Sequence, residues 1–264
     1  MRENKLREMM KQGKPTIGTR ILSPWPGIME IIGHCGEMDY VEFSSEYAPY
    51  DLHDLENLAR ASELFEMSTM MKVDQEPRGY LAQRAIGSGI QNILFADVRT
   101  VEDAQECVRI VRAETSETKG TNGCSMRRHV GYLKECGSPA FVQAMEDSVV
   151  AIMIEKKSAV DNLEEILSVE GIDMVQFGPC DYSLSLGLPG RWEHPKVKEA
   201  ELRVIKTALE MGVAPRAEIE SADEAKKYMD LGVRDFNIGV DVVILHNFLK
   251  SNGAHLRKEL SDLR

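Results

Sequence analysis

Two acidic residues each follow a short apolar run rich in β-branched side chains. Glu155 comes directly after Val149–Ile154, and Asp181 follows Met174–Cys180. If both runs are strands of one parallel sheet, a single helical crossover separates them. Both carboxylates then emerge at the carboxyl edge, where α/β folds build their active sites. Because carboxylates on neighbouring strands suit a hard cation such as Mg²⁺ or Mn²⁺, the pair predicts a divalent-metal site.

Each carboxylate also has an ordinary structural interpretation. Glu155 could pair with Lys156 or Lys157, and Asp181 could cap the next helix through Ser183. The turn that holds Asp181 favours the functional interpretation, because glycine and proline leading into a helix expose backbone N–H groups that can hold a carboxylate or phosphate. The spacing alone leaves both interpretations open.

The elements that must position these residues follow a regular rhythm of short β-type runs and longer helical patterns. Such a rhythm predicts repeated βα units around a parallel sheet. The order of helix, glycine and apolar strand recurs at least five times, which a two-domain or sandwich fold would not produce. We therefore predict an α/β fold, a single (β/α)8 TIM barrel spanning residues 1–264. The eight expected strands are Thr16–Thr19, Tyr40–Phe43, Ser68–Val73, Asn92–Phe95, Val149–Ile154, Met174–Phe177, Val213–Arg216 and Asp235–Gly239.

Other segments have expected places in this barrel. The long segment Ala113–Gln143, after the fourth strand and its helix, is rich in Gly, Ser, Thr and Arg and is expected to lie over the strand ends as a lid or interface element. Leu6, Met9 and Met10 suit an N-terminal helix that covers the closed end of the barrel. Arg216 ends the seventh strand, where a barrel-closing salt bridge and a role in the site are both open.

Composition excludes several classes of partner. The 264 residues carry a net charge of −11, which argues against nucleic acid or an anionic membrane surface, since both need clustered Lys and Arg. The longest apolar stretch, Val149–Ile154, is far below the roughly 18 residues of a membrane helix, and the charged start does not resemble a secretory signal. We expect a cytoplasmic protein with a small-molecule partner. Its five cysteines, an odd number without a C-x-x-C pair, fit reduced thiols.

Several motifs together resemble the HpcH/HpaI family of metal-dependent class II aldolases. Members cleave 4-hydroxy-2-oxo acids to pyruvate and an aldehyde and belong to the phosphoenolpyruvate/pyruvate barrel superfamily. The resemblance implies that Glu155 and Asp181 bind Mg²⁺ or Mn²⁺, and that the metal and the turn Gly178, Pro179, Cys180 and Asp181 hold a 2-oxo acid. The motifs are Glu46–Pro49, Ile154–Glu155, Gly171–Asp173, Gly178–Ser183, Gly120–Gly123, His194–Pro195 and Gly239–Asp241.

The chain departs from the family pattern at four positions. Tyr47 stands where the family has an acid–base His, and Ser44 stands where an Asp commonly orients that His. Lys72 replaces the Arg that stabilises the enolate, and Met153 replaces a Gln at the rim of the substrate site. Lys72 can still place a positive charge near an enolate. Tyr47 suits a general acid, and serves as a base only if Lys72 and the metal lower its pKa.

These observations lead to one preferred function and two alternatives. The preferred function is a divalent-metal-dependent carbon–carbon lyase acting on 2-oxo acids, with Lys72 and Tyr47 as catalytic residues and Met153 in the substrate site. A water on the metal is the other candidate for moving the proton. The alternatives are an oxaloacetate-type decarboxylase and a non-catalytic protein that binds metal and 2-oxo acid. The resemblance also implies a homo-oligomer, a trimer or hexamer, in which C-terminal helices such as Val242–Leu249 are exchanged between neighbours.

Overall fold

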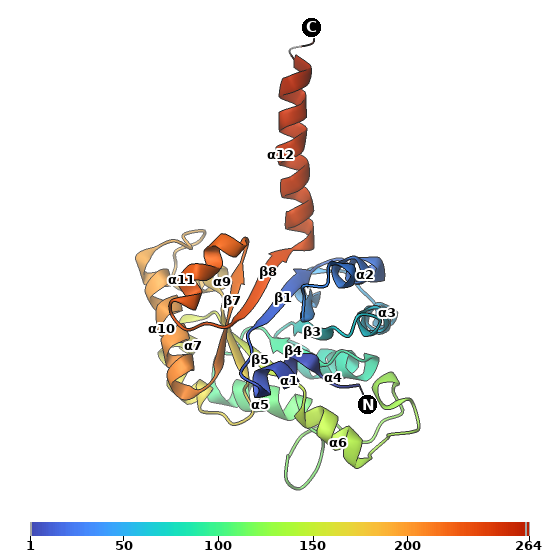
Figure 1. Cartoon of the computed structure of the whole chain (residues 1–264). Coiled ribbons are helices and arrows are strands. Elements are labelled where there is room, and N and C mark those ends of the chain that lie inside the picture. The colour runs from blue at the N-terminus through green and yellow to red at the C-terminus, as the bar shows by residue number, and fades with distance from the viewer. Residues whose placement is uncertain (1, 262, 264) are drawn as a thin grey trace.

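Parallel strands close into a barrel in the computed structural model, which describes residues 2–261 and 263 (Figure 1). The predicted TIM barrel is confirmed, and within the described residues every predicted strand is present with ends shifted by at most three residues. Met1, Asp262 and Arg264, at the ends of the predicted domain, lie outside the described residues. The strands are β1 Thr16–Ile21, β2 Tyr40–Ser44, β3 Ser68–Val73, β4 Asn92–Phe95, β5 Val150–Ile154, β6 Met174–Phe177, β7 Ala214–Ile219 and β8 Asp235–Val240.

Helices surround the barrel on its outside. Their starts follow local rules, as in the helix from Val101, where the Thr100 side chain and Asp103 cap each other's backbone N–H groups. Several end at a glycine in the left-handed conformation, such as Gly89 and Gly212. The helices are α1 Lys5–Lys11, α2 Pro26–Cys35, α3 Leu52–Glu63, α4 Arg78–Ser88, α5 Val101–Val111, α6 Pro139–Glu146, α7 Lys157–Asp161, α8 Leu163–Leu167, α9 Pro179–Ser185, α10 Pro195–Met211, α11 Ala225–Met229 and α12 Asp241–Ser261, with 3₁₀ turns η1 Ser45–Tyr47, η2 Arg128–Val130 and η3 Ala222–Glu224.

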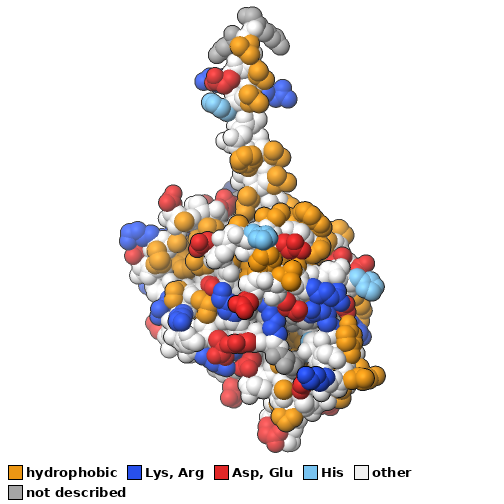
Figure 2. Space-filling model, turned by 45° about the vertical axis from the view of Figure 1, so that its right-hand side comes forward, with side chains coloured by type: hydrophobic (Ala, Val, Ile, Leu, Met, Phe, Trp, Pro, Cys, Tyr) orange, Lys and Arg blue, Asp and Glu red, His pale blue; other side chains and the backbone are white. Residues whose placement is uncertain are grey.

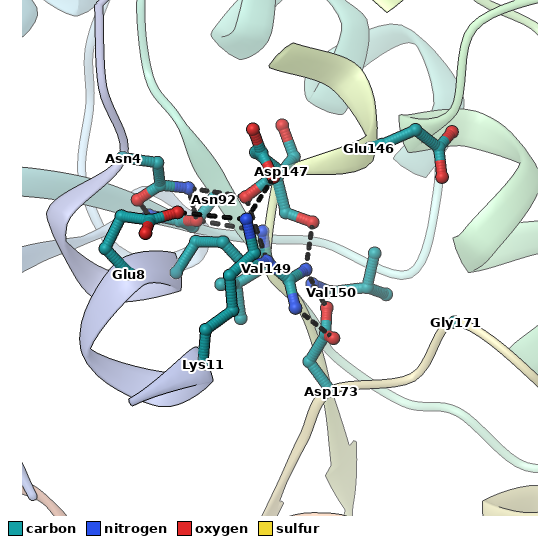
Figure 3. A network of polar contacts seen from close by, with 12 residues as sticks. Asn4, Glu8, Lys11, Asn92, Glu146, Asp147, Val149, Val150, Gly171 and Asp173 are labelled. Atoms are coloured by element: carbon teal, nitrogen blue, oxygen red, sulfur yellow. Dashed lines mark hydrogen bonds and ion pairs between the residues drawn. The ribbon is translucent and has the colours of Figure 1, made fainter. Parts of the chain in front are cut away.

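The N-terminal helix closes the amino end of the barrel, as predicted. Leu6 is fully buried and packs with inward-facing side chains such as Tyr40, Met70 and Leu94. Polar contacts fasten the helix in place (Figure 3). The side-chain amide of Asn4, at the start of α1, donates to Asn92 Oδ1 at 2.7 Å. Arg7, within α1, forms a bidentate pair with Asp173 at 2.6 Å. Among the described residues, α1 therefore covers the amino end of the barrel interior.

The long segment between α5 and β5 does not lie over the carboxyl ends of the strands, so that expectation is wrong. Arg127 donates to the carbonyl of Gln83 in α4, and Arg128 pairs with Glu63 at the end of α3. Arg128 and His129 also line a cavity together with N-terminal residues. The physical reason is that the segment follows a helix, so it leaves from the amino end of the barrel.

The expectation of reduced thiols is also wrong for two cysteines. Cys124 and Cys136 form a disulfide inside this long segment, with 5.5 Å between their Cα atoms. Cys35, Cys107 and Cys180 are free. The pairing joins two positions of one irregular loop, and no repeating pattern in the sequence marks their closeness.

The last helix, α12, stands away from the barrel (Figure 1). None of its residues that the structure describes is buried, and apolar side chains run along it (Figure 2). Asp241 anchors its start by accepting from the backbone N–H groups of Leu22 and Ser23, each at 3.0 Å. Among the described helices, none is long and apolar enough to cross a membrane.

Candidate active site at the carboxyl mouth

The predicted site residues gather at the carboxyl ends of neighbouring strands. Glu155 directly follows β5, and Asp181 lies in the first turn of α9, which begins after β6. Lys72 is in β3, and Tyr47 ends η1, which follows β2. β2 is paired with β3, and β5 is paired with β6. All four side chains therefore belong to the same mouth of the barrel.

Glu155 is the buried member of the acidic pair. Its side chain is only 3% exposed, and its Oε1 accepts from the backbone N–H of Asp97 at 2.8 Å. Burial raises the pKa of this carboxyl; the Lys72 charge opposes that shift, and the charges of Asp181 and Asp97 add to it. Glu155 and Asp181 follow the paired strands β5 and β6, and Glu155 packs against Gly178 at the start of the turn that holds Asp181, so both carboxylates belong to the same edge of the barrel.

Gly178 is required for this arrangement. A Cβ atom at this position would lie 2.5 Å from Glu155 Oε2 and 3.1 Å from Met153 Cε. Any side chain would therefore displace the carboxylate. Met153 is itself buried in the barrel interior, so it forms an apolar wall beside Glu155 and the turn.

Asp181 has a lysine partner. Lys156 Nζ lies 2.8 Å from Asp181 Oδ1 and 2.9 Å from Asp97 Oδ1, while Lys157 pairs with Asp161. The ordinary interpretation is therefore wrong in its details, because Glu155 is paired with neither lysine. Asp181 does not act through Ser183 either, since the Ser183 hydroxyl donates to the Cys180 carbonyl at 2.7 Å.

Lys72 is a buried cation whose ammonium group contacts two polar side chains. Its Nζ donates to Tyr47 Oη at 2.9 Å and lies 2.7 Å from Glu46 Oε2. Burial, the largest single influence, acts to lower the pKa of Lys72, but Glu155, Tyr47 and Glu46 together raise it above its usual value. Lys72 therefore stays protonated and can stabilise negative charge but cannot take a proton.

Tyr47 lies beside Lys72 at the mouth. Burial raises the pKa of Tyr47, Lys72 acts to lower it and Glu46 adds to the rise, so the pKa stands above its ordinary value. With Lys72 alone, Tyr47 is a phenol that can donate a proton, and its use as a base, which needs the metal as well, stays a prediction. Its ring is half exposed at the mouth.

Sequence reasoning missed a polar layer inside the barrel. Arg216 and Glu42 form an ion pair in which each side chain is 1% exposed, so Arg216 is the barrel salt bridge considered above. The Gln176 carbonyl accepts from Arg216 Nε at 2.7 Å. The signal was present, because polar residues alternate with apolar ones along β2 and β7, at positions that face the interior of a barrel. The layer comprises Arg20, Glu42, Ser44, Gln176, Arg216, Glu218 and Asn237.

A closed barrel with reactive groups at the carboxyl ends of its strands defines a barrel enzyme. The chain belongs to the HpcH/HpaI aldolase/citrate lyase family, whose model matches residues 22–247, so the resemblance inferred from the sequence is confirmed. It is an aldehyde-lyase of the class II pyruvate aldolase type, that is, a carbon–carbon lyase. Members typically depend on a divalent metal.

Individual relatives cover nearly the whole chain. A 4-hydroxy-2-oxo-heptane-1,7-dioate aldolase from Escherichia coli is 28% identical over 249 residues, covering 92% of this chain and 91% of the relative. A hydroxypyruvate/pyruvate aldolase from Roseobacter denitrificans is 28% identical over 257 residues, covering 95% and 96%. The crystal structure of an HpcH/HpaI aldolase/citrate lyase family protein from Burkholderia cenocepacia is 26% identical, with a TM-score of 0.87 over 97% of this chain and 100% of that one.

Proposed function

We propose that this protein is a divalent-metal-dependent aldolase that cleaves 4-hydroxy-2-oxo acids to pyruvate and an aldehyde at the mouth built by Glu155, Asp181, Lys72 and Tyr47. The observation that carries the proposal is the placement of Glu155 and Asp181 after the paired strands β5 and β6, with Glu155 packed against Gly178 in the turn that leads to Asp181.

The donor set fits Mg²⁺ or Mn²⁺. Both ligands would be carboxylates, the oxygen donors that these hard cations prefer. A buried carboxylate needs a compensating positive charge. Lys72 acts on Glu155 but also pairs with Glu46, so a bound cation would complete the compensation of Glu155. Glu155 and Asp181 would hold the cation, which when bound would act as a Lewis acid on the 2-oxo group of the substrate.

The chain's own residues would perform the remaining steps. The turn Gly178–Asp181 and the wall formed by Met153 would bind and orient the 2-oxo acid. As the bond between C3 and C4 breaks, the proton of the 4-hydroxyl passes to solvent and the aldehyde forms. Lys72 would stabilise the negative charge on the enolate oxygen. The neutral phenol of Tyr47 would donate its proton to C3 and regain one from solvent. Cytoplasmic location stays a prediction.

Proton exchange of pyruvate tests the proposal directly. The wild-type protein incubated with Mn²⁺ and pyruvate in D₂O is expected to replace the methyl protons of pyruvate by deuterium, because an enolate must form and be reprotonated at C3. Loss of the methyl signal by proton NMR is the measurement, with metal-free protein as the control. Tight binding of pyruvate without exchange would instead favour a non-catalytic binding protein. Release of pyruvate from oxaloacetate, without cleavage of any 4-hydroxy-2-oxo acid, would favour the decarboxylase.

Lys156 is expected to weaken metal binding. It places a positive charge 2.8 Å from an oxygen of Asp181, where it would compete with a cation. We expect Lys156→Met to tighten Mn²⁺ binding about tenfold, the order of one such charge interaction, as measured by isothermal titration calorimetry. Lys157→Met is the matched control, because Lys157 pairs with Asp161. Weaker Mn²⁺ binding in Lys156→Met would show that the lysine positions Asp181 instead.

We also propose that α12 binds a second copy of this chain. Leu245, Phe248, Leu249 and Leu256 are each more than half exposed and recur at the spacing of one helix face. An apolar stripe of this length on a helix anchored at its start by Asp241 is typical of a subunit interface. This supports the predicted homo-oligomer.

The oligomer is expected to dissociate when this stripe is charged. Leu245→Glu combined with Phe248→Glu should lower the molar mass measured by light scattering after gel filtration, because burying two carboxylates in the interface is costly. Leu64→Glu, at an exposed leucine after α3, is the control and should keep the wild-type mass. An unchanged mass for the double variant would contradict the assignment.

A further inference from the structure

Asp97 is linked to both members of the acidic pair, to one directly and to the other through a lysine. It lies two residues after β4, and its backbone N–H donates to Glu155 Oε1 at 2.8 Å. On its side chain, Oδ1 lies 2.9 Å from Lys156 Nζ, and the same Nζ lies 2.8 Å from Asp181 Oδ1. One residue of the loop after β4 therefore connects the carboxylates that follow β5 and β6.

The conformation and the burial of Asp97 suit this position. Its φ of 55° is in the left-handed region, which aspartate and asparagine tolerate better than most residues. Its Oδ1 is buried and accepts no hydrogen bond from the described residues. It forms an ion pair with Lys156 at 2.9 Å and a longer one with Arg99 Nη2 at 3.7 Å, so Lys156 is the closer counter-charge of this carboxylate.

The contact between Lys156 and Asp181 can be reached from solvent. Both residues line a cavity of about 510 Å³ at the carboxyl mouth, and their side chains are 19% and 42% exposed. An ammonium group and a divalent cation repel each other and compete for the same carboxylate. Binding of a cation to Asp181 would therefore displace Lys156, and Asp97 is the other carboxylate, among the described residues, with which its ammonium group is paired.

We propose that Asp97 is a positioning residue that holds Lys156 when a divalent cation binds to Asp181. This inference rests on the proposed function and names how the same site exchanges one cation for another. In the metal-free site, Lys156 compensates the charges of both aspartates. In the metal-bound site, Lys156 keeps its ion pair with Asp97, so its ammonium group is not left without a counter-charge. Asp97 thus favours metal binding without being a metal ligand.

A double-mutant cycle of Mn²⁺ affinity tests this role. Asp97→Asn suits the left-handed backbone and keeps the N–H that donates to Glu155, so it removes mainly the charge. We expect Asp97→Asn to weaken Mn²⁺ binding about fivefold, the order of one partly exposed ion pair, by isothermal titration calorimetry. In the Lys156→Met background, the same substitution should change the affinity by less than about twofold, because no ammonium group remains to be held.

Asp161→Asn is the matched control, because Asp161 pairs with Lys157 on α7, and it should keep the wild-type affinity. A similar loss in both backgrounds would show that Asp97 acts on the cation directly or by orienting Glu155, and would overturn the inference. An affinity for Asp97→Asn equal to or above that of the wild type would overturn it as well. In either case the aldolase proposal stands as long as the wild-type protein binds Mn²⁺. A wild-type protein that binds no Mn²⁺ overturns both.

Discussion

Replacing Glu155 by glutamine is expected to reduce Mn²⁺-stimulated exchange of the pyruvate methyl protons by about a thousandfold, the effect of losing several kcal/mol of charge stabilisation. Glutamine keeps the shape and can still accept from the Asp97 backbone N–H, so the barrel should be little disturbed. It lacks the negative charge that a divalent cation requires. The exchange rate by NMR and Mn²⁺ affinity by calorimetry should fall together.

The control for this experiment is Glu165→Gln. Glu165 is exposed on α8, and the substitution makes the same chemical change away from the mouth, so wild-type exchange is expected. If Glu155→Gln keeps Mn²⁺-stimulated exchange at the wild-type rate, Glu155 is not a metal ligand. The mechanism proposed here would then be abandoned, and the family and fold would remain.

The largest effect on stability is expected from breaking the ion pair inside the barrel. Burial acts to raise the pKa of Glu42, but Arg216 and Arg20 together lower it, so the carboxylate stays charged beside Arg216. Glu42→Leu would leave the Arg216 guanidinium buried without its counter-charge. We expect a loss of about 3–5 kcal/mol in the free energy of unfolding, measured by urea denaturation.

A double variant separates the unpaired charge from other effects. Glu42→Leu/Arg216→Met removes both charges and should recover most of the lost stability, because buried ion pairs can often be replaced by apolar side chains at little cost. If the single variant loses less than about 1 kcal/mol, water or a conformational change must be solvating Arg216. Equal losses in the single and double variants would instead assign the effect to packing.

The strands could be predicted because their pattern is local. Five of them come shortly after a glycine that follows a helical pattern, and even the short β4 and β6 have the predicted ends. The helical pattern from Ala159 to Leu167 was less informative, since it divides at Asn162 into α7 and α8. Asn162 alone departs from helical backbone angles. The spacing of apolar residues does not reveal such a single-residue interruption.

The site was predictable only as far as strand order brings residues together. Glu155 and Asp181 follow adjacent strands, so their closeness follows from topology. Lys156 binds Asp97 as well as Asp181, and that contact depends on side-chain directions between loops more than fifty residues apart in the chain. The balance of burial against charge that sets the pKa of Tyr47 likewise exists only in the folded protein.

The seal that α1 forms beneath the barrel has a kinetic consequence. With Leu6 packed in the interior and Arg7 bonded to Asp173, α1 closes the amino end of the barrel among the described residues, and the site lies at the carboxyl mouth. Substrate and products then pass through the same opening, and a product that remains in it delays the release of the other. We therefore expect the two products to leave one after the other. Product release, as well as bond cleavage, would then limit turnover.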